Sequence, residues 1–452
     1  MKLSKLLKPI TSVCREADFE VVNVTSDIDM VTRNSVFIPI KGEAFDSHIY
    51  IDEALKRGAF VVRYTNNHQI SGILKQRFIG NPCDSMKCIG VIGTNGKSSV
   101  VHYLKSFLDT YKVGVIVNAT FYINDEKLMK FKNTTPNSED LMKVMQMCKD
   151  AKCDYFIMEI SSHAIKQERI AGLKFDTLIY TNISQDHLDY HKSIMEYTST
   201  KIMGNSYLKK NGFILCNDED IREMLERYYK RVINLKMKYP YHSYLDSYRR
   251  ILDIDTKHIA LRVLSKFDVD NMMFAYAYMR ECDFDFMDIY KHMMNVKGLQ
   301  GRMELIYNDS FKIIIDYAHT YMAYYELCQY VANIEAHKVL VFGLGGNRDE
   351  YKREMIGKLV GKYFDLVIVT TDNARNENPE KICSEIVSSM NNNYIIILNR
   401  EEAIRKAISI IENNGIIIIA GKGNEEFQII GDQKIPFKDK DIVYKILNKE
   451  EV

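Results

Sequence analysis

The sequence predicts an α/β protein of three domains: a small α/β N-terminal domain, a central parallel-sheet domain with a phosphate (P-loop) turn, and a doubly wound, Rossmann-like C-terminal domain. Short apolar runs alternate with longer amphipathic stretches from about residue 86 to 298, and the alternation starts again from about 299 to 452. This is the pattern of parallel strands joined by helices. A glycine-rich turn follows the first run. A chain of 452 residues is also too long for one hydrophobic core.

The first 85 residues precede this alternation and have a pattern of their own. Apolar runs at 35–42 and 58–62 flank a stretch that contains His48 and Ala54, and the segment closes near Asn81-Pro82. We expect short strands and a helix here, which make up the N-terminal domain, residues 1–85.

The glycine-rich turn lies between the apolar run 88–92 and the helical stretch 100–104. A strand, a glycine turn and a helix N-terminus in this order present backbone N–H groups to an anion. The lysine can reach a terminal phosphate and the following serine can reach Mg²⁺. The spacing is shorter than the full GxxxxGK[ST] motif, so a tight turn without a ligand is the alternative. The residues expected to hold nucleotide phosphates are Gly93, Thr94, Asn95, Gly96, Lys97, Ser98 and Ser99.

Polar motifs follow three of the strands expected in the central domain, 86–298. These strands are placed at 87–92, 112–117, 154–160, 177–182 and 212–217. Ligands bind at the carboxyl ends of parallel strands, so we expect Glu159 and His187 to lie beside Ser98. A carboxylate and a hydroxyl suit Mg²⁺. Each residue also has an ordinary structural interpretation, a helix-capping acid for Glu159 and a core histidine for His187.

The C-terminal domain, 299–452, is expected to repeat this architecture. Its strands are placed at 311–316, 338–343, 365–371, 393–399 and 415–420. Polar or glycine-rich turns follow most of them, including Asp316 to Thr320, Gly343 to Asp349, Asp372 to Arg375 and Gly421 to Glu425.

Composition excludes several kinds of protein. Basic and acidic residues number 61 and 60, which leaves a net charge of +1 and no electrostatic footprint for nucleic acid or an anionic membrane. The nine cysteines are scattered and indicate neither a disulfide framework nor a zinc site. The N-terminus lacks the apolar centre of a signal peptide, and no run is long enough to span a membrane. We expect a cytoplasmic protein without nucleic-acid or membrane partners.

An ordered series of motifs resembles the Mur ligase family, and within it the ligases that add the third residue of the peptidoglycan stem peptide. The series comprises GTNGKS at 93–98, MEISSHA at 158–164, TNIS and DHLDYH within 181–191, GRME at 301–304, DYAHT at 316–320, GLGGNRD at 343–349 and AGKG at 420–423. The resemblance implies an ATP-dependent amide-bond ligase that uses Mg²⁺ and forms an acyl phosphate. It also implies that the N-terminal domain holds a uridine nucleotide. The chain departs from the family at Ser26-Asp27-Ile28-Asp29, where those ligases have Asp-Ser-Arg after a threonine.

The resemblance also assigns roles to residues of this sequence. Lys97, Glu159, His187 and Lys201 match catalytic positions, and Lys201 is the lysine that the family carbamylates to hold a second Mg²⁺. The implied metal ligands are therefore Ser98, Glu159, His187 and Lys201. ATP contacts beyond the phosphate loop are implied for Asn271, Arg302 and Asp316, although Asp268 replaces the first Asn of the family's F-N-x-x-N. Binding of the UDP-N-acetylmuramoyl-dipeptide is implied for Thr134, Thr135, Ser161, Gln167 and Arg169. The residues around Thr135 also have an ordinary structural interpretation, as the start of a helix that Ser138 caps.

The incoming amino acid is indicated by Asp372-Asn373-Ala374-Arg375. Family members that add meso-diaminopimelate have D-N-P-R there, and a guanidinium suits bidentate recognition of a carboxylate. Arg348 and Arg375 are expected to hold the amino-acid carboxylates, and Gly421 and Glu425 the distal amino group. Ala374 and Asn424 replace the usual proline and histidine.

The sequence therefore predicts a ligase that joins meso-diaminopimelate to UDP-N-acetylmuramoyl-L-Ala-D-Glu, with ATP and Mg²⁺, as a monomer. Three alternatives stay open: a related ligase with another carboxylate acceptor, a lysine-adding ligase, and a nucleotide-binding scaffold without catalysis. The joint presence of the catalytic positions argues against the scaffold.

Overall fold

The structure is a computed structural model that describes residues 1–8, 10, 18–42, 45–63, 67–184, 186–246, 249–348, 350–391 and 393–448. The chain divides into two compact units: residues 1–241 with 270–293, and residues 242–269 with 294–452. Each unit is described by itself, and the finer division into three domains stays a prediction. Within the described ranges, no helix is both long and apolar enough to cross a membrane.

The N-terminal part of the first unit is a small parallel sheet with three helices. Its elements are α1 (Leu3–Leu7), β1 (Asn23–Thr25), β2 (Ser35–Phe37), α2 (Ile51–Lys56), β3 (Phe60–Val61) and α3 (Asn67–Phe78). The strands pair in the order β1-β2-β3. Helix α3 lies against the central part of the unit at Gly72, where an added Cβ would meet the carbonyl oxygen of Ala171 at 2.1 Å. Only a glycine allows this approach of two backbones.

The centre of the first unit is an eight-stranded sheet in the order β11-β10-β9-β4-β8-β5-β6-β7. Its strands are β4 (Lys87–Ile92), β5 (Val113–Val117), β6 (Thr120–Ile123), β7 (Glu126–Lys130), β8 (Tyr155–Ile160), β9 (Phe175–Tyr180), β10 (Leu208–Cys216) and β11 (Val232–Asn234). Its helices are α4 (Lys97–Phe107), α5 (Ser138–Asp150), α6 (Ser162–Lys166), α7 (Leu188–His191), α8 (Ile194–Met203), α9 (Glu219–Glu226), α10 (Leu235–Lys238), α11 (Lys266–Glu281) and α12 (Phe286–Asn295), of which the last two cross the unit boundary.

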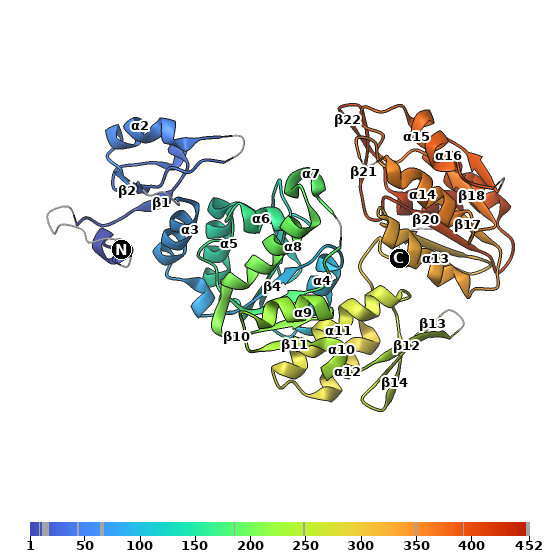
Figure 1. The fold of residues 1–452 in the computed structure, drawn as a ribbon, viewed down its shortest axis with the longest axis horizontal. Coiled ribbons are helices and arrows are strands. Elements are labelled where there is room, and N and C mark those ends of the chain that lie inside the picture. Colours follow the sequence, from blue (N-terminus) through green and yellow to red (C-terminus); the bar gives the residue numbers. More distant parts are fainter. Residues whose placement is uncertain are drawn as a thin grey trace. The chain divides into compact units, whose positions relative to one another are not determined.

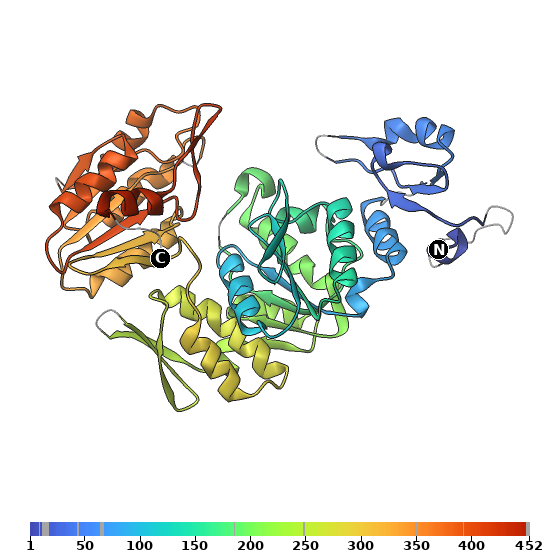
Figure 2. The same ribbon diagram turned by 180° about the vertical axis from the view of Figure 1, so that it is seen from behind.

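Helices cover both faces of this sheet (Figures 1 and 2). Apolar residues of α5, α6, α8 and α9 share one buried cluster with alternate residues of the strands, whereas α4 contacts β4, β5 and β8 from outside that cluster. After β4 the chain forms α4 and then β5, which lies on the β8 side of β4. Strand β9 forms later and pairs with β4 on the opposite side. The turn after β4 is thus at the switch point of the strand order, where open α/β sheets bind ligands.

The second unit holds a six-stranded sheet in the order β15-β16-β20-β17-β18-β19 and a separate antiparallel sheet β12-β13-β14. Its strands are β12 (His242–Asp246), β13 (Arg249–Ile254), β14 (Lys257–Leu261), β15 (Glu304–Asn308), β16 (Lys312–Asp316), β17 (Lys338–Phe342), β18 (Leu366–Val369), β19 (Tyr394–Ile396), β20 (Ile416–Ala420), β21 (Phe427–Ile430) and β22 (Gln433–Pro436). Its helices are α13 (Tyr321–Ala332), α14 (Tyr351–Val360), α15 (Pro379–Val387), α16 (Arg400–Ile410) and α17 (Asp439–Leu447).

Both faces of the six-stranded sheet are buried. Alternate strand residues such as Ile314 and Ile418 pack with α13, α14 and α15, and the residues between them, such as Ile313 and Ile417, pack with α16 and α17. The sheet is therefore doubly wound, as the repeated alternation predicts.

All ten strands predicted for the two sheets are present, with ends shifted by a few residues. The sequence analysis missed the hairpins β6-β7 and β21-β22, the sheet β12-β13-β14 and the edge strands β11 and β15. Except for β11, a short parallel strand, these are antiparallel, and some have exposed residues on both faces, so they lack a continuous apolar run.

Candidate functional site

The phosphate loop joins β4 to α4 and is held by the segment that follows β9. Thr94 N donates to Asn182 O at 2.9 Å and Asn95 N donates to Asn182 Oδ1 at 3.0 Å. Gly96 has φ +82° and forms the N-cap of α4, and Asn271 packs so closely that an added Cβ at Gly96 would lie 2.3 Å from its Oδ1. The loop residues Ser98 and Ser99 belong to the first turn of α4, whose N–H groups and dipole favour an anion.

Two lysines converge on the loop carbonyl groups. Lys97 Nζ donates to Gly93 O and Thr94 O, both at 2.9 Å, and Lys201 Nζ donates to Gly93 O at 2.6 Å. Lys201 is 1% exposed. Burial lowers its pKa well below the ordinary lysine value, and the charge of Lys97 lowers it further. The loop therefore contacts a buried lysine whose pKa is lowered.

Glu159 is the penultimate residue of β8, not a helix cap, and lies beside Ser98. Ser98 Oγ donates to Glu159 Oε1 at 2.9 Å, and Asn118 N donates to the same oxygen at 3.1 Å. A hydroxyl and a carboxylate this close fit Mg²⁺, which usually takes one or two protein oxygens and completes its shell with water and phosphate. Among the described residues, no three His, Cys, Asp or Glu side chains form a metal cluster. The donor set thus fits a nucleotide-bound Mg²⁺ rather than a metal held by protein alone.

His187 lies in a cluster of aromatic rings next to this loop. Its ring centroid is 5.0 Å from that of His163 and 6.3 Å from that of Tyr197, and its side chain is 47% exposed. It is therefore not the core histidine of the structural interpretation. Tyr197 connects the cluster to the loop, because its hydroxyl lies 3.0 Å from Thr94 Oγ1 and Lys201 Nζ lies 4.6 Å from its ring centroid.

The residues expected to bind the nucleotide-peptide form a connected network. Thr135 Oγ1 donates to Glu159 O at 2.9 Å, and Arg169 Nη1 donates to Thr135 O at 3.1 Å. Arg169 Nε also donates to Gln167 Oε1 at 2.8 Å, and Ser161 N donates to Thr135 Oγ1 at 3.0 Å. Thr134 precedes Thr135 in the same turn. The expected cap of the next helix is wrong by one residue, since Asn137 rather than Ser138 caps α5.

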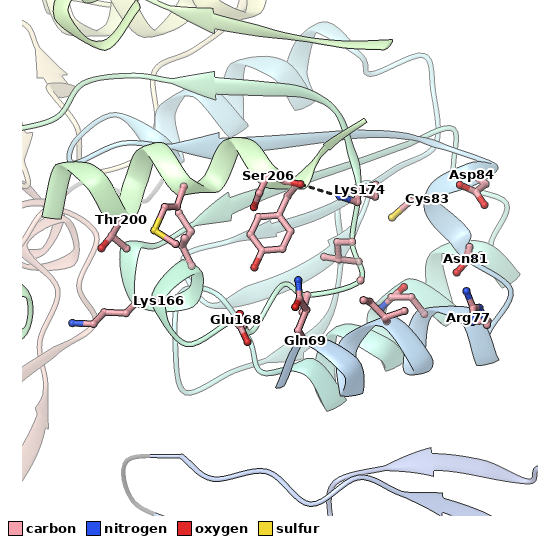
Figure 3. A pocket seen from close by; sticks show the side chains of 18 residues that line it. Gln69, Arg77, Asn81, Cys83, Asp84, Lys166, Glu168, Lys174, Thr200 and Ser206 are labelled. Atoms are coloured by element: carbon pink, nitrogen blue, oxygen red, sulfur yellow. Dashed lines mark hydrogen bonds between the residues drawn. The ribbon is translucent and has the colours of Figure 1, made fainter. Parts of the chain in front are cut away.

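A groove of about 650 Å³ lies in the same unit between α3 and the segment 165–207 (Figure 3). Lys174 Nζ crosses it to donate to Ser206 O at 2.9 Å. None of the predicted site residues lines this groove. Helix α8 lies between the groove and the phosphate loop, because Thr200 lines the groove and Lys201 bonds to the loop.

In the second unit, Asp316 organises the residues expected to contact ATP. Its carboxylate accepts from Met303 N and Ala318 N, both at 2.8 Å, and Arg302 lies 4.4 Å from the ring centroid of Tyr317. Burial raises the pKa of Asp316, while Arg302 and these N–H groups oppose that rise. Gly423 packs against Tyr317, since an added Cβ would lie 2.7 Å from Tyr317 Cβ.

The residues expected to bind the amino acid gather in the same unit, around the turns that follow β17, β18 and β20. Arg375 Nη1 donates to Gly346 O at 2.7 Å, and Asn373 Nδ2 donates to Glu425 Oε2 at 2.8 Å. Arg348 is exposed nearby, its Cγ 3.9 Å from an added Cβ at Gly345. Asp372 Oδ2 lies 2.6 Å from an added Cβ at Gly421, which has φ +110°. The turn thus presents carboxylates and a guanidinium together.

Sequence reasoning missed three residues that build these sites. Asn118 has φ +48°, and its N–H donates to Glu159. Tyr197 supports the phosphate loop through Thr94. Lys422 is 0% exposed, and its Nζ donates to Glu425 Oε2 at 3.0 Å. Asn118 and Tyr197 stand outside the quoted motifs. Lys422 is within AGKG, and only its burial distinguishes it from a surface lysine.

The chain matches two domain models, the Mur ligase middle domain over residues 91–279 and the Mur ligase, glutamate ligase domain over residues 301–423. It is 33% identical over 483 residues to a UDP-N-acetylmuramoyl-L-alanyl-D-glutamate--2,6-diaminopimelate ligase from Caldanaerobacter subterraneus subsp. tengcongensis, with 100% of both chains covered. It is 30% identical over 486 residues to the ligase 1 of that name from Clostridium acetobutylicum, covering 99% of this chain and 100% of the relative.

Solved structures resemble the fold. A UDP-N-acetylmuramoyl-L-alanyl-D-glutamate--2,6-diaminopimelate ligase matches with a TM-score of 0.72 at 22% identity, covering 99% of both chains. A MurF ligase from Thermotoga maritima in complex with ADP matches with a TM-score of 0.60 at 16% identity, covering 88% of this chain and 93% of that one.

Proposed function

The chain belongs to the Mur ligase family, and we propose that it is the ATP-dependent ligase that joins meso-diaminopimelate to UDP-N-acetylmuramoyl-L-Ala-D-Glu. The observation that carries this proposal is the match along the whole length of ligases named for that reaction, at 30% and 33% identity. The reaction belongs to peptidoglycan precursor synthesis.

The residues of the first unit suit the activation of a carboxylate by ATP. A carboxylate is a poor acyl donor, and transfer of a phosphoryl group to it creates an acyl phosphate that an amine can attack. The N–H groups at the start of α4 and the ammonium of Lys97 would offset the negative charge that develops on the transferring phosphoryl group. The position of Lys97 supports this role, because its Nζ donates to Gly93 O and Thr94 O of the loop.

Ser98 and Glu159 are the residues that would hold Mg²⁺ on the nucleotide, with His187 and a carbamylated Lys201 as the proposed ligands of a second ion. The metal would supply charge neutralisation and alignment of the phosphates with the acceptor carboxylate. The lowered pKa of Lys201 supports carbamylation, because only the neutral amine adds to CO₂. Asn271, Arg302 and Asp316 are proposed to bind the rest of ATP.

The proposed acceptor site uses Thr134, Thr135, Ser161, Gln167 and Arg169 for the nucleotide-peptide. The diamino acid would bind in the second unit, its carboxylates at Arg348 and Arg375 and its distal amino group at Gly421 and Glu425, with Asp372 and Asn373 as further contacts. The contact of Arg375 Nη1 with Gly346 O supports this, since it fixes one edge of the guanidinium and orients the group. The monomeric state and the cytoplasmic location stay predictions.

The test is phosphate release by the purified protein with ATP, Mg²⁺ and UDP-N-acetylmuramoyl-L-Ala-D-Glu, comparing meso-diaminopimelate with L-lysine. We expect release that depends on both the nucleotide-peptide and diaminopimelate. Release that prefers lysine would replace the amino acid in the proposal. Release that ignores the nucleotide-peptide would favour another carboxylate acceptor, and a protein that binds ATP without release would favour the scaffold.

A further inference from the structure

Behind the turn Asp372 to Arg375 lies a buried ion pair that the proposed chemistry does not use. Arg400, the first residue of α16, and Asp439, the first residue of α17, are 2% and 0% exposed. Arg400 Nε and Nη2 donate to the two carboxylate oxygens of Asp439 at 2.7 and 2.8 Å. The pair is bidentate and fully removed from water.

Neither the helix nor the stability of the fold accounts for a cation at this place. The first turn of a helix favours anions, so Arg400 stands at the wrong end of α16 for the helix dipole. A buried ion pair is also often no more stabilising than apolar side chains of similar volume.

Arg400 contacts the substrate turn through one hydrogen bond. Its Nη2 also donates to Ala420 O at 2.9 Å, the residue before Gly421. Its Nη1 is buried without a hydrogen-bond partner among the described residues. Asp372 lies against the residue that follows Ala420, since its Oδ2 would be 2.6 Å from an added Cβ at Gly421.

The balance of charge around Asp372 depends on Arg400. Burial raises the pKa of Asp372, and the charge of Arg400 is the largest influence that lowers it, followed by Lys422. Glu425 and Asp439 raise the same pKa. Two tyrosines are also close enough to interact with Asp372, Tyr324 on α13 and Tyr317, and burial raises the pKa of both.

We propose that Arg400 is a positioning residue for the amino-acid subsite: its bond to Ala420 O fixes the start of the Gly421 turn, and its buried guanidinium supplies the positive charge beside the carboxylate of Asp372 that packs on this turn. The subsite thereby accepts the cationic amino group of a diamino acid. The inference rests on the proposed function and names a residue that needs no contact with the substrate.

The test compares two variants that break the same ion pair with opposite effects on Asp372. In Arg400→Met, Asp372 loses a neighbouring positive charge and binds a proton more readily. We expect the acidic limb of the pH profile of kcat/KM for diaminopimelate to move to higher pH by roughly one unit. The KM for diaminopimelate should rise about tenfold, while the KM for ATP stays unchanged. In Asp439→Asn, a negative charge is lost, so the acidic limb moves to lower pH. Arg400→Lys, which keeps the charge, should leave the limb near that of the wild type.

A double variant, Arg400→Met with Asp439→Leu, guards against a failure to fold, because it leaves neither charge unpaired. Its acidic limb still moves up, since Arg400 influences Asp372 more than Asp439 does. Limbs that move together in Arg400→Met and Asp439→Asn, or that do not move, would overturn the inference while the proposed function stands. A wild-type protein without diaminopimelate-dependent release would overturn both.

Discussion

Lys201 Nζ donates to the carbonyl oxygen of Gly93 at 2.6 Å, although the two residues are 108 positions apart in the chain. This bond connects α8 to the turn between β4 and α4. It places a lysine whose pKa is lowered by burial against the phosphate loop.

The stability of the protein is expected to depend on pH through Lys201. The pKa of its amine is low in the folded protein and ordinary in the unfolded chain, so the unfolded chain binds more protons between these values and stability rises with pH there. Lys201→Met removes this effect. In CO₂-free buffer we expect Lys201→Met to gain on the order of 1 kcal/mol relative to wild type at neutral pH, and this difference should shrink as the pH approaches 10.5. Urea unfolding across this range measures it, and a difference that grows with pH would contradict the lowered pKa of Lys201.

Lys97→Ala is expected to abolish ATP-dependent ligation, with a loss of roughly a thousandfold or more in kcat. The ammonium of Lys97 lies on the loop, and no other described side chain of α4 donates to Gly93 O. Lys105→Ala is the matched control, because Lys105 lies on the same helix and pairs with the exposed Asp125. Ligase activity that persists in Lys97→Ala would exclude the assigned phosphate site.

Glu159→Gln tests the proposed Mg²⁺ site without changing the shape of the side chain. Glu159 is 2% exposed and accepts from both Ser98 Oγ and Asn118 N, so an amide oxygen can keep one of these bonds while the charge is lost. We expect the Mg²⁺ concentration for half-maximal phosphate release to rise about tenfold. Glu223→Gln, at an exposed position of α9, should leave it unchanged. An unchanged requirement in Glu159→Gln would remove Glu159 from the metal site.

The sequence predicted the parallel strands and the residues at their ends because both depend on local signals. A strand buried on both faces, such as β8, is a continuous apolar run, and the polar residue that ends its pattern, Glu159, stands out at once. The supporting residues could not be found this way. Asn118 contributes a backbone N–H at φ +48°, and Arg400 is distinguished by its burial and by its pairing with Asp439, 39 positions away in the chain. Neither property can be predicted from the residue type alone.

Arg375→Ala is expected to raise the KM for diaminopimelate by roughly ten- to a hundredfold, because the distal carboxylate loses its guanidinium partner. Lysine lacks that carboxylate, so any activity with lysine should change much less, and the preference for diaminopimelate over lysine should fall. Arg405→Ala, at an exposed position that pairs with Glu401, is the control. A preference that stays the same in Arg375→Ala would assign specificity to other residues.

Gly346→Ala tests whether the turn around Arg375 must lie against the neighbouring loop. An added Cβ at Gly346 would lie 2.0 Å from the carbonyl oxygen of Ala374, and the obstacle is backbone, so the two loops must move apart. That movement breaks the bond from Arg375 Nη1 to Gly346 O, and we expect the KM for diaminopimelate to rise while the KM for ATP stays near that of the wild type. Gly298→Ala is the matched control, since its added Cβ would meet no atom closer than 3.7 Å. If Gly346→Ala and Gly298→Ala bound diaminopimelate equally well, the guanidinium of Arg375 would not need the loop to orient it.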